Sequence, residues 1–149
     1  DYMFRTERSK FLMEQGIPLN TDSTLKGQTV FLAERCAELI QTDIITDRTV
    51  IDVMAFTLNA KSIPHQDKEA FEEYAKEFIR DYDYIFYISP YGIDIEDNGV
   101  RETDEHYRDL IDFTITTLIK RHGHKAGKIE KISGSTEERI QQILNITGL

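Results

Sequence analysis

Cysteine is nearly absent from this sequence. Cys36 is the only one in 149 residues, so no disulfide can form within the chain. It lies in a helical pattern, where we expect a buried, reduced thiol. Long apolar stretches are also missing: none approaches the roughly 20 residues that a membrane span requires, and the first residues contain neither an apolar signal core nor a cleavage site. We therefore expect a cytoplasmic protein.

Positive charge is scarce as well. The 27 acidic residues outnumber the 18 basic ones, which gives a net charge of −9 at pH 7. Broad binding to nucleic acid or to an anionic membrane depends on an excess of lysine and arginine, which this chain lacks. We expect neither as a partner, and any phosphate group must be held by a few local groups.

A phosphate-binding loop of the form G-x-x-x-x-G-K-[ST] is absent. The nearest segment, residues 123–129, has its glycines one residue too close and Ile129 in place of the hydroxyl residue, and it is predicted to run from a helix to a strand. The chain also begins at Asp1 without an initiator methionine, which is consistent with a fragment of a longer protein. Residues 1–149 therefore do not encode such a loop.

What the sequence does contain is an alternation of helices and strands in a length typical of one domain. Apolar residues at helical spacing, with capping and stop signals, predict helices over residues 5–15, 24–41, 50–60, 67–80, 104–122 and 135–144. Ser23 or Thr24 can cap the second of these helices, and Ser135 begins a capping-box-like sequence at the last. Short apolar runs predict parallel strands over residues 43–47, 84–88 and 128–132. Helices between such strands imply crossover connections, so we predict a three-layer α/β fold with a parallel sheet. Ligands of such sheets bind beyond the carboxyl ends of the strands.

Asp47 and Arg48 follow directly after one of these predicted strands. In a nucleotide-binding sheet, an acid at this point holds Mg²⁺ or a water that coordinates it. The alternative is that Asp47 caps the helix that begins near Thr49. The spacing alone favours neither interpretation.

Residues 94–105 resemble a calcium-binding loop, with Asp94 first, Gly99 sixth and Glu105 twelfth. The third position is Glu96 instead of Asp or Asn, and the segment follows a strand and not a helix. We therefore expect no specific calcium binding, although a calcium module remains an alternative. A second interpretation is that a turn at Asp97 to Gly99 projects Arg101.

Arg108 follows Arg101 by one to two helical turns, and two arginines beside a mobile loop can hold phosphoryl oxygens as the loop closes. The simpler alternative is a solvated face on which these arginines balance neighbouring acids.

Taken together, these segments resemble the nicotinamide-riboside-kinase-like (NadR-type) P-loop ATPases and kinases, many of which are encoded by phages. Residues 47–57, DRTVIDVMAFT, are similar to the D-R-x-x-x-D-x-x-A-[YF]-T block of that family. Residues 82–90 are similar to its Y-D-x-[apolar]4-x-P strand, and residues 97–101 to its D-G-x-R lid segment. Residues 16–20, Gln28 and residues 134–140 are also similar, so the resemblance covers essentially the whole chain.

The resemblance implies transfer of a phosphoryl group from ATP to a small nucleoside- or nucleotide-like acceptor. It implies that Asp47 binds Mg²⁺, and that Arg101 and Arg108 are catalytic residues of a lid formed by residues 91–122. Its substrate-binding residues would be Arg48, Asp97, Gly99 and Glu7. It further implies that a strand, the phosphate loop and a helix, roughly 30 residues, precede this chain. The alternative from a different class is a nucleotide-sensing or partner-binding domain without catalysis.

Overall fold

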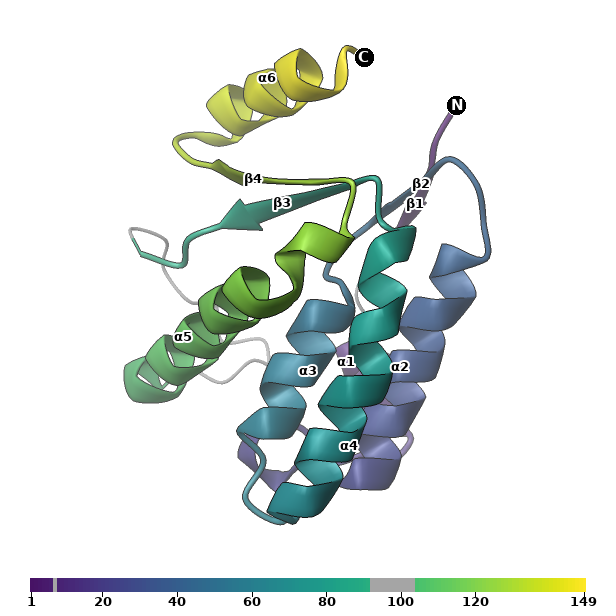
Figure 1. Ribbon diagram of the computed structural model, residues 1–149, viewed down its shortest axis with the longest axis vertical. Coiled ribbons are helices and arrows are strands. Elements are labelled where there is room, and N and C mark those ends of the chain that lie inside the picture. The colour runs from purple at the N-terminus through teal and green to yellow at the C-terminus, as the bar shows by residue number, and fades with distance from the viewer. Residues whose placement is uncertain (7, 92–103) are drawn as a thin grey trace.

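The computed structural model describes residues 1–6, 8–91 and 104–149 (Figure 1). Its strands are β1 (Met3–Arg5), β2 (Ile44–Thr46), β3 (Tyr84–Ile88) and β4 (Lys128–Ile132). Its helices are α1 (Ser9–Glu14), α2 (Leu25–Leu39), α3 (Val50–Leu58), α4 (His65–Ala75), α5 (Glu105–His122) and α6 (Thr136–Thr147). Short 3₁₀ turns lie at Asn20–Asp22, Lys76–Asp81 and Gly123–Lys125.

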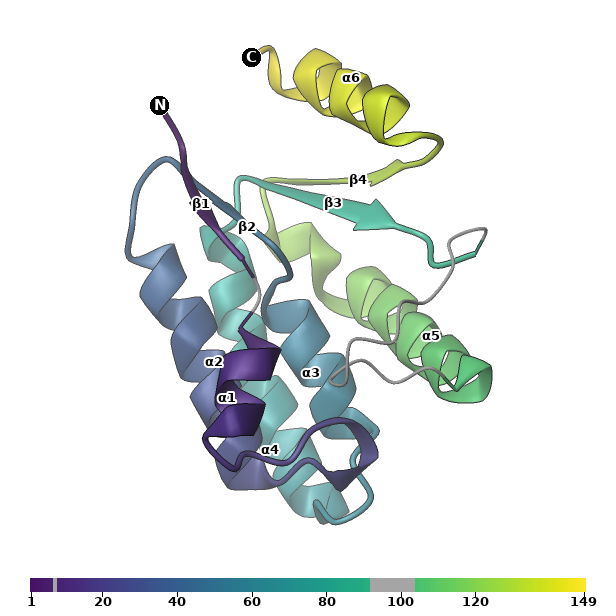
Figure 2. The same cartoon turned by 180° about the vertical axis from the view of Figure 1, so that it is seen from behind.

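The four strands form two separate pairs, each of them parallel. In one pair β1 lies beside β2, with Phe4 opposite Ile45; in the other β3 lies beside β4, with Phe86 opposite Glu130. Helices α1 to α5 lie on one side of the strands and α6 on the other, as both ribbon views show (Figures 1 and 2). The mixed α/β class is confirmed, but the predicted continuous sheet of a three-layer P-loop fold is not seen among the described residues.

All three strands predicted from the sequence are present, while β1 was missed. The sequence pattern predicts a helix from residue 5, whereas α1 begins at Ser9. The three residues of β1 are all exposed, so they show no alternation of buried and exposed positions. A strand this short is defined by its partner β2 and not by its own pattern.

Helix α3 lies at the centre of the core. Val50, Met54 and Ala55 are fully buried, and the cluster around them includes residues of α2, α4, α5 and β3. A helix that is apolar on nearly every side must be surrounded by other elements. The predicted helix over residues 50–60 is thus confirmed and explained.

The buried face of α2 includes polar and charged residues, and the expected full burial of Cys36 is not observed. Thr24 caps this helix as one of the two predicted caps, since its side chain accepts a hydrogen bond from the amide of Gly27. The buried positions, however, include Gln28 and Arg35, whereas Val30 is exposed and Cys36 only half-buried. The apolar spacing was misleading because polar side chains of this helix are paired inside the protein.

Gly127 belongs to the segment 123–129, which does not match a phosphate-loop pattern, and its role in the fold is structural. Its amide donates to the carbonyl of Tyr82 at the start of the β3 and β4 pair. A Cβ atom at this position would collide with the backbone of Asp83. Glycine is therefore needed here for the close approach of two backbones.

Among the helices of the described residues, none combines the length and the apolar character that a membrane span requires.

Tyr82 joins α3 to the segment that leads into β3. Its hydroxyl accepts a hydrogen bond of 3.2 Å from the amide of Val50, the first residue of α3. Both residues are buried, and burial raises the pKa of the Tyr82 hydroxyl, so it stays neutral. The first amides of a helix have no partner within the helix, and this one is satisfied from outside.

Tyr82→Phe should lower the free energy of unfolding by about 1 to 2 kcal/mol, because it leaves a buried amide without an acceptor. Urea denaturation would measure this loss. Tyr74→Phe is the matched control, because the Tyr74 side chain is mostly exposed, and its stability should be unchanged. Equal stability of the two variants would contradict the role assigned to Tyr82.

Glu72 of α4 connects two basic residues at the end of α5. Its carboxylate accepts hydrogen bonds of 2.6 Å from Arg121 and 2.7 Å from His122, whose side chain is buried. Burial raises the pKa of Glu72, but the hydrogen bonds from His122 and Arg121 outweigh that effect and hold the pKa below its ordinary value.

A carboxylate with a lowered pKa stabilises the fold at neutral pH, and this stabilisation is lost as the pH falls through the folded-state pKa. Glu72→Gln should therefore reduce stability at pH 7 and weaken its dependence on pH below the ordinary glutamate pKa. Glu73→Gln, at a mostly exposed position of the same helix, should leave the pH profile unchanged. Thermal melts at a series of pH values would show whether the two profiles differ.

Candidate functional site

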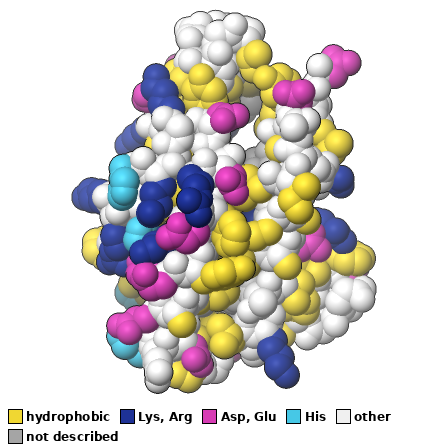
Figure 3. Space-filling view, turned by 45° about the vertical axis from the view of Figure 1, so that its right-hand side comes forward, with side chains coloured by type: hydrophobic (Ala, Val, Ile, Leu, Met, Phe, Trp, Pro, Cys, Tyr) yellow, Lys and Arg dark blue, Asp and Glu magenta, His cyan; other side chains and the backbone are white. Residues whose placement is uncertain are grey.

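A cavity of about 1300 Å³ lies between the two strand pairs. Residues of β2 and β3 form its sides, and residues of α2, α3, α5 and α6 contribute to its walls. The space-filling view shows a hollow between α6 and the N-terminal arm, with hydrophobic side chains at its border (Figure 3). The carboxyl ends of β2 and β3 both border this cavity, which is where an α/β fold binds its ligands.

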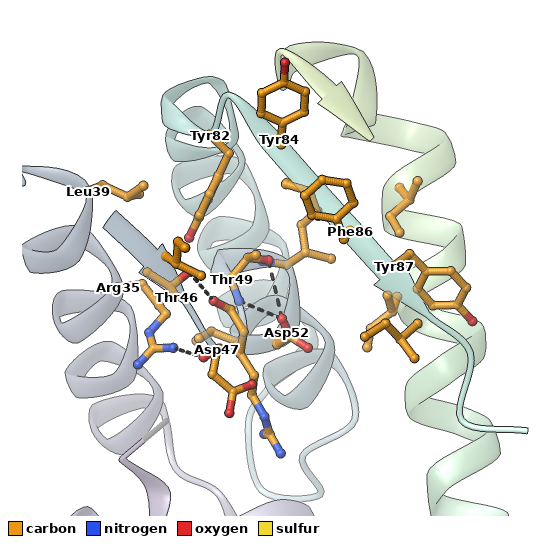
Figure 4. Close-up of a pocket in the computed structure, with 18 of the residues that line it drawn as sticks. Arg35, Leu39, Thr46, Asp47, Thr49, Asp52, Tyr82, Tyr84, Phe86 and Tyr87 are labelled. Atoms are coloured by element: carbon orange, nitrogen blue, oxygen red, sulfur yellow. Dashed lines mark hydrogen bonds between the residues drawn. The ribbon is translucent and has the colours of Figure 1, made fainter. Parts of the chain in front are cut away.

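Asp47 lies at the end of β2 and lines the cavity (Figure 4). Its amide donates to the carbonyl of Arg5, and its own carbonyl accepts a hydrogen bond of 2.8 Å from Nη1 of Arg35. The side chain itself is exposed, and within the described part of the chain it forms no salt bridge. The backbone is therefore held in place while the carboxylate is available to a ligand.

The capping alternative for Asp47 is contradicted. Helix α3 is capped by Thr49, whose hydroxyl accepts from the amide of Ile51, and Asp52 accepts in return from the amide of Thr49 at 2.8 Å. This reciprocal pair is a capping box. The sequence already contained its T-x-x-D signal, which places the cap two residues after Asp47.

Arg35 and Glu38 support the loop that carries Asp47. They form a buried salt bridge of 2.7 Å within α2, with side chains only 4% and 8% exposed. Burial raises the pKa of Glu38, although the nearby Arg35 opposes this effect. The burial of Arg35 was not predicted from the sequence, because a charged pair three residues apart is usually a feature of an exposed helix face.

Arg48 follows Asp47 in a left-handed backbone conformation, with a φ of +78°. Its carbonyl accepts a hydrogen bond of 3.0 Å from the hydroxyl of Thr46. Its guanidinium group lies 5.3 Å from the centre of the Phe56 ring, a favourable cation–π contact. A non-glycine residue in this conformation is strained, and such strain tends to occur at functional sites.

Because of the strain at Arg48, a glycine variant at this position should be more stable than an alanine variant, which is the reverse of the usual order within a helix. Arg48→Gly should be more stable than Arg48→Ala by roughly 1 kcal/mol, because both lose the side chain and only glycine adopts a positive φ without cost. At Glu69, an exposed position within α4, alanine should instead be the more stable by about 1 kcal/mol. Urea denaturation of the four variants measures these differences in stability. The same order of glycine and alanine stability at both positions would contradict backbone strain at Arg48.

The opposite wall of the cavity comes from β3 and α5. Tyr87 donates a short hydrogen bond to the carboxylate of Asp112, and burial together with this bond raises the pKa of Tyr87 to about 12. Arg108, one turn before Asp112 on α5, is half-buried, lines the same cavity and lies 6.0 Å from the centre of the Tyr91 ring. Tyr87 and Asp112 were not predicted as site residues, because their pairing joins residues 25 positions apart.

The structure thus brings three of the predicted site residues, Asp47, Arg48 and Arg108, to one cavity. Glu7, Asp97, Gly99 and Arg101 lie outside the described residues. So does the loop part of the predicted 91–122 lid, while its helical part is α5.

Most of the calcium-like segment 94–105 also lies outside the described residues. Of its last two positions, Asp104 caps α5 by accepting a hydrogen bond from the amide of His106, and Glu105 is the first residue of that helix. Among the residues that are described, no group of three or more His, Cys, Asp or Glu side chains could hold a metal ion.

Comparison with known proteins adds no further assignment. No protein-family model, no curated protein and no solved structure matches the chain. The resemblance to the P-loop kinases therefore remains a prediction from the sequence.

Proposed function

We propose that residues 1–149 form the magnesium- and acceptor-binding part of an ATP-dependent kinase for small nucleoside- or nucleotide-like compounds. The observation that carries this proposal is the placement of Asp47 and Arg108. An exposed carboxylate without a salt bridge in the described part of the chain lines the same cavity as a half-buried guanidinium group. That combination suits a phosphate group accompanied by a cation.

In this proposal Asp47 would hold Mg²⁺ or a water bound to it, which suits an ion that is typically held by one or two carboxylates and several waters. Bound Mg²⁺ would neutralise charge on the phosphate oxygens. Arg108 would contact phosphoryl oxygens from α5, and Arg48 would contact the acceptor. Arg35 would act through Asp47, as a positioning residue that holds its carbonyl.

The triphosphate of ATP needs a series of backbone amides as its cradle, and the sequence of residues 1–149 has no loop of that type. The isolated chain should therefore bind ATP weakly or not at all, and it should have no kinase activity. Isothermal titration of the chain with Mg-ATP tests this expectation. Tight binding would show that the phosphate site is built differently, and the kinase proposal would be withdrawn.

The role of Asp47 is tested in a longer form of the protein that carries a phosphate loop. Asp47→Asn should lower turnover by orders of magnitude and leave the melting temperature nearly unchanged, because the side chain supports no described fold contact. Asp43→Asn is the control at the other end of β2, where the residue is also exposed and has a φ of +53° that asparagine tolerates. Turnover lowered equally in both variants, or in neither, would contradict the proposal.

A nucleotide-sensing or partner-binding domain without catalysis is the second candidate, and a longer form of the protein without a phosphate loop would favour it. It predicts that the longer form binds a nucleotide without any turnover. Measuring binding and phosphate release on the same preparation separates the two candidates.

A further inference from the structure

Asp112 lies on the face of α5 that lines the cavity, and Arg108 lies one helical turn before it. Residues four positions apart on a helix are neighbours on one face. Ile115 and Ile119 continue this face and also line the cavity. The cavity is thus polar at the amino-terminal end of α5 and apolar further along the helix. Its polar end is the part that can recognise the polar groups of a ligand.

Tyr87 of β3 holds the Asp112 carboxylate from one side. Figure 4 shows the Tyr87 ring extending from β3 toward α5, where its hydroxyl donates to Oδ1 of Asp112. The Ser89 hydroxyl is hydrogen-bonded to Tyr87 and opposes the rise of the Tyr87 pKa, which identifies Ser89 as the donor. Because that pKa is about 12, Tyr87 keeps its proton at neutral pH. The three groups therefore form a chain of hydrogen bonds that ends at Asp112.

The second carboxylate oxygen of Asp112 is available to a ligand. Within the described part of the chain, this side chain forms no salt bridge and accepts a hydrogen bond from Tyr87 alone. It is only half-buried, so part of its surface is open to the cavity. An ionised carboxylate accepts hydrogen bonds and cannot donate them. The ligand group that meets Asp112 must therefore be a donor.

Arg108 restricts the kind of donor that fits. An ammonium group bound to Asp112 would be repelled by the guanidinium group one turn away on the same helix face. Hydroxyl groups are neutral donors and avoid this repulsion. The same guanidinium group attracts anions, and its planar geometry suits phosphate oxygens. Together the two side chains suit a molecule that carries hydroxyl groups close to a phosphate group.

We propose that the Asp112 carboxylate, positioned by Tyr87, accepts a hydrogen bond from a ribose hydroxyl group of a ligand whose phosphate group lies at Arg108. The ligand class is a ribose phosphate, either free or as part of a nucleotide. One helical turn rises only about 5.4 Å, and a ribose phosphate presents both groups on adjoining parts of one small molecule. This inference rests on the proposed function for the phosphate contact of Arg108, and it adds the residue that selects the sugar.

Such a site discriminates between ribose and deoxyribose compounds. A deoxy compound displaces water from the half-buried carboxylate without replacing its hydrogen bond, which is costly. Sites that are built to bind a hydroxyl group reject analogues that lack it. Hydrogen bonds to a charged group are among the stronger ones, so we expect selectivity of roughly tenfold or more.

Titration of residues 1–149 with ribose 5-phosphate, followed by heteronuclear NMR, tests this selectivity without any kinase reaction. The 2-deoxy and 3-deoxy forms of the same sugar phosphate are the comparison, because each keeps the phosphate group and lacks one hydroxyl group. At least one of them should bind roughly tenfold more weakly than ribose 5-phosphate. Equal affinity for all three compounds, or no binding of any of them, would overturn the proposal.

Asp112→Ala should lower the affinity for ribose 5-phosphate to that for the weaker deoxy compound, so that the ratio of the two affinities approaches one. The ratio is the informative quantity, because loss of a negative charge changes the attraction of every phosphate compound alike. Asp109→Ala is the matched control at an exposed position of α5, and it should keep the ratio of the unmodified chain. A ratio unchanged by Asp112→Ala would contradict the assignment.

Tyr87→Phe keeps the ring between β3 and α5 and removes only the hydroxyl, so it also covers the case in which Asp112→Ala does not fold. The ratio of affinities should fall several-fold, because Asp112 is no longer held in one orientation. Tyr84→Phe is the control, because Tyr84 lies on the opposite face of the same strand and is 40% exposed. If Tyr87 only joins β3 to α5, Tyr87→Phe will lower the melting temperature and leave the ratio unchanged, which would reject its positioning role.

Two outcomes separate the ribose site from the kinase proposal. Selectivity for ribose 5-phosphate in residues 1–149, together with no turnover by a longer form that carries a phosphate loop, would support the ribose site and reject the kinase. Turnover by that longer form with equal use of ribose and deoxyribose acceptors would support the kinase and overturn the ribose site.

Discussion

The structure depends on a constraint of backbone chemistry: each strand has polar amide and carbonyl groups along both edges, and groups removed from water need partners. One edge of β2 is satisfied by β1 and one edge of β3 by β4. The remaining two edges border the same cavity and run in the same direction. Within the described part of the chain, the cavity therefore separates two strand edges that have no strand partner.

The helical layer explains how two separate strand pairs keep their relative positions. Helix α3 follows β2 directly, and its capping box at Thr49 and Asp52 fixes the turn between them. Tyr82, just before β3, is hydrogen-bonded to the first amide of the same helix. Both cavity edges are therefore anchored to α3, whose own apolar surface is buried on nearly all sides. The core can hold the two pairs apart without any hydrogen bond between β2 and β3.

The elements that were predictable from the sequence are those whose signal is local. The apolar runs of β2, β3 and β4, the Thr24 cap and the Ser135 capping box are all contained within a few consecutive residues. The missed features involve partners distant in sequence. Strand β1 exists through its pairing with β2, and Arg35 is buried because it meets the carbonyl of Asp47 twelve residues later.

The same distinction applies to the candidate site. The sequence showed that Asp47 follows a strand. It did not show whether the side chain caps the helix or is available to a ligand, because both roles use a carboxylate at that position. The structure excludes the capping role, because Thr49 and Asp52 satisfy the helix and Arg35 holds the Asp47 carbonyl. The work of stabilising the turn is thus done by neighbouring residues. A carboxylate that the fold does not need, on a backbone that the fold holds firmly, is suited to binding a ligand.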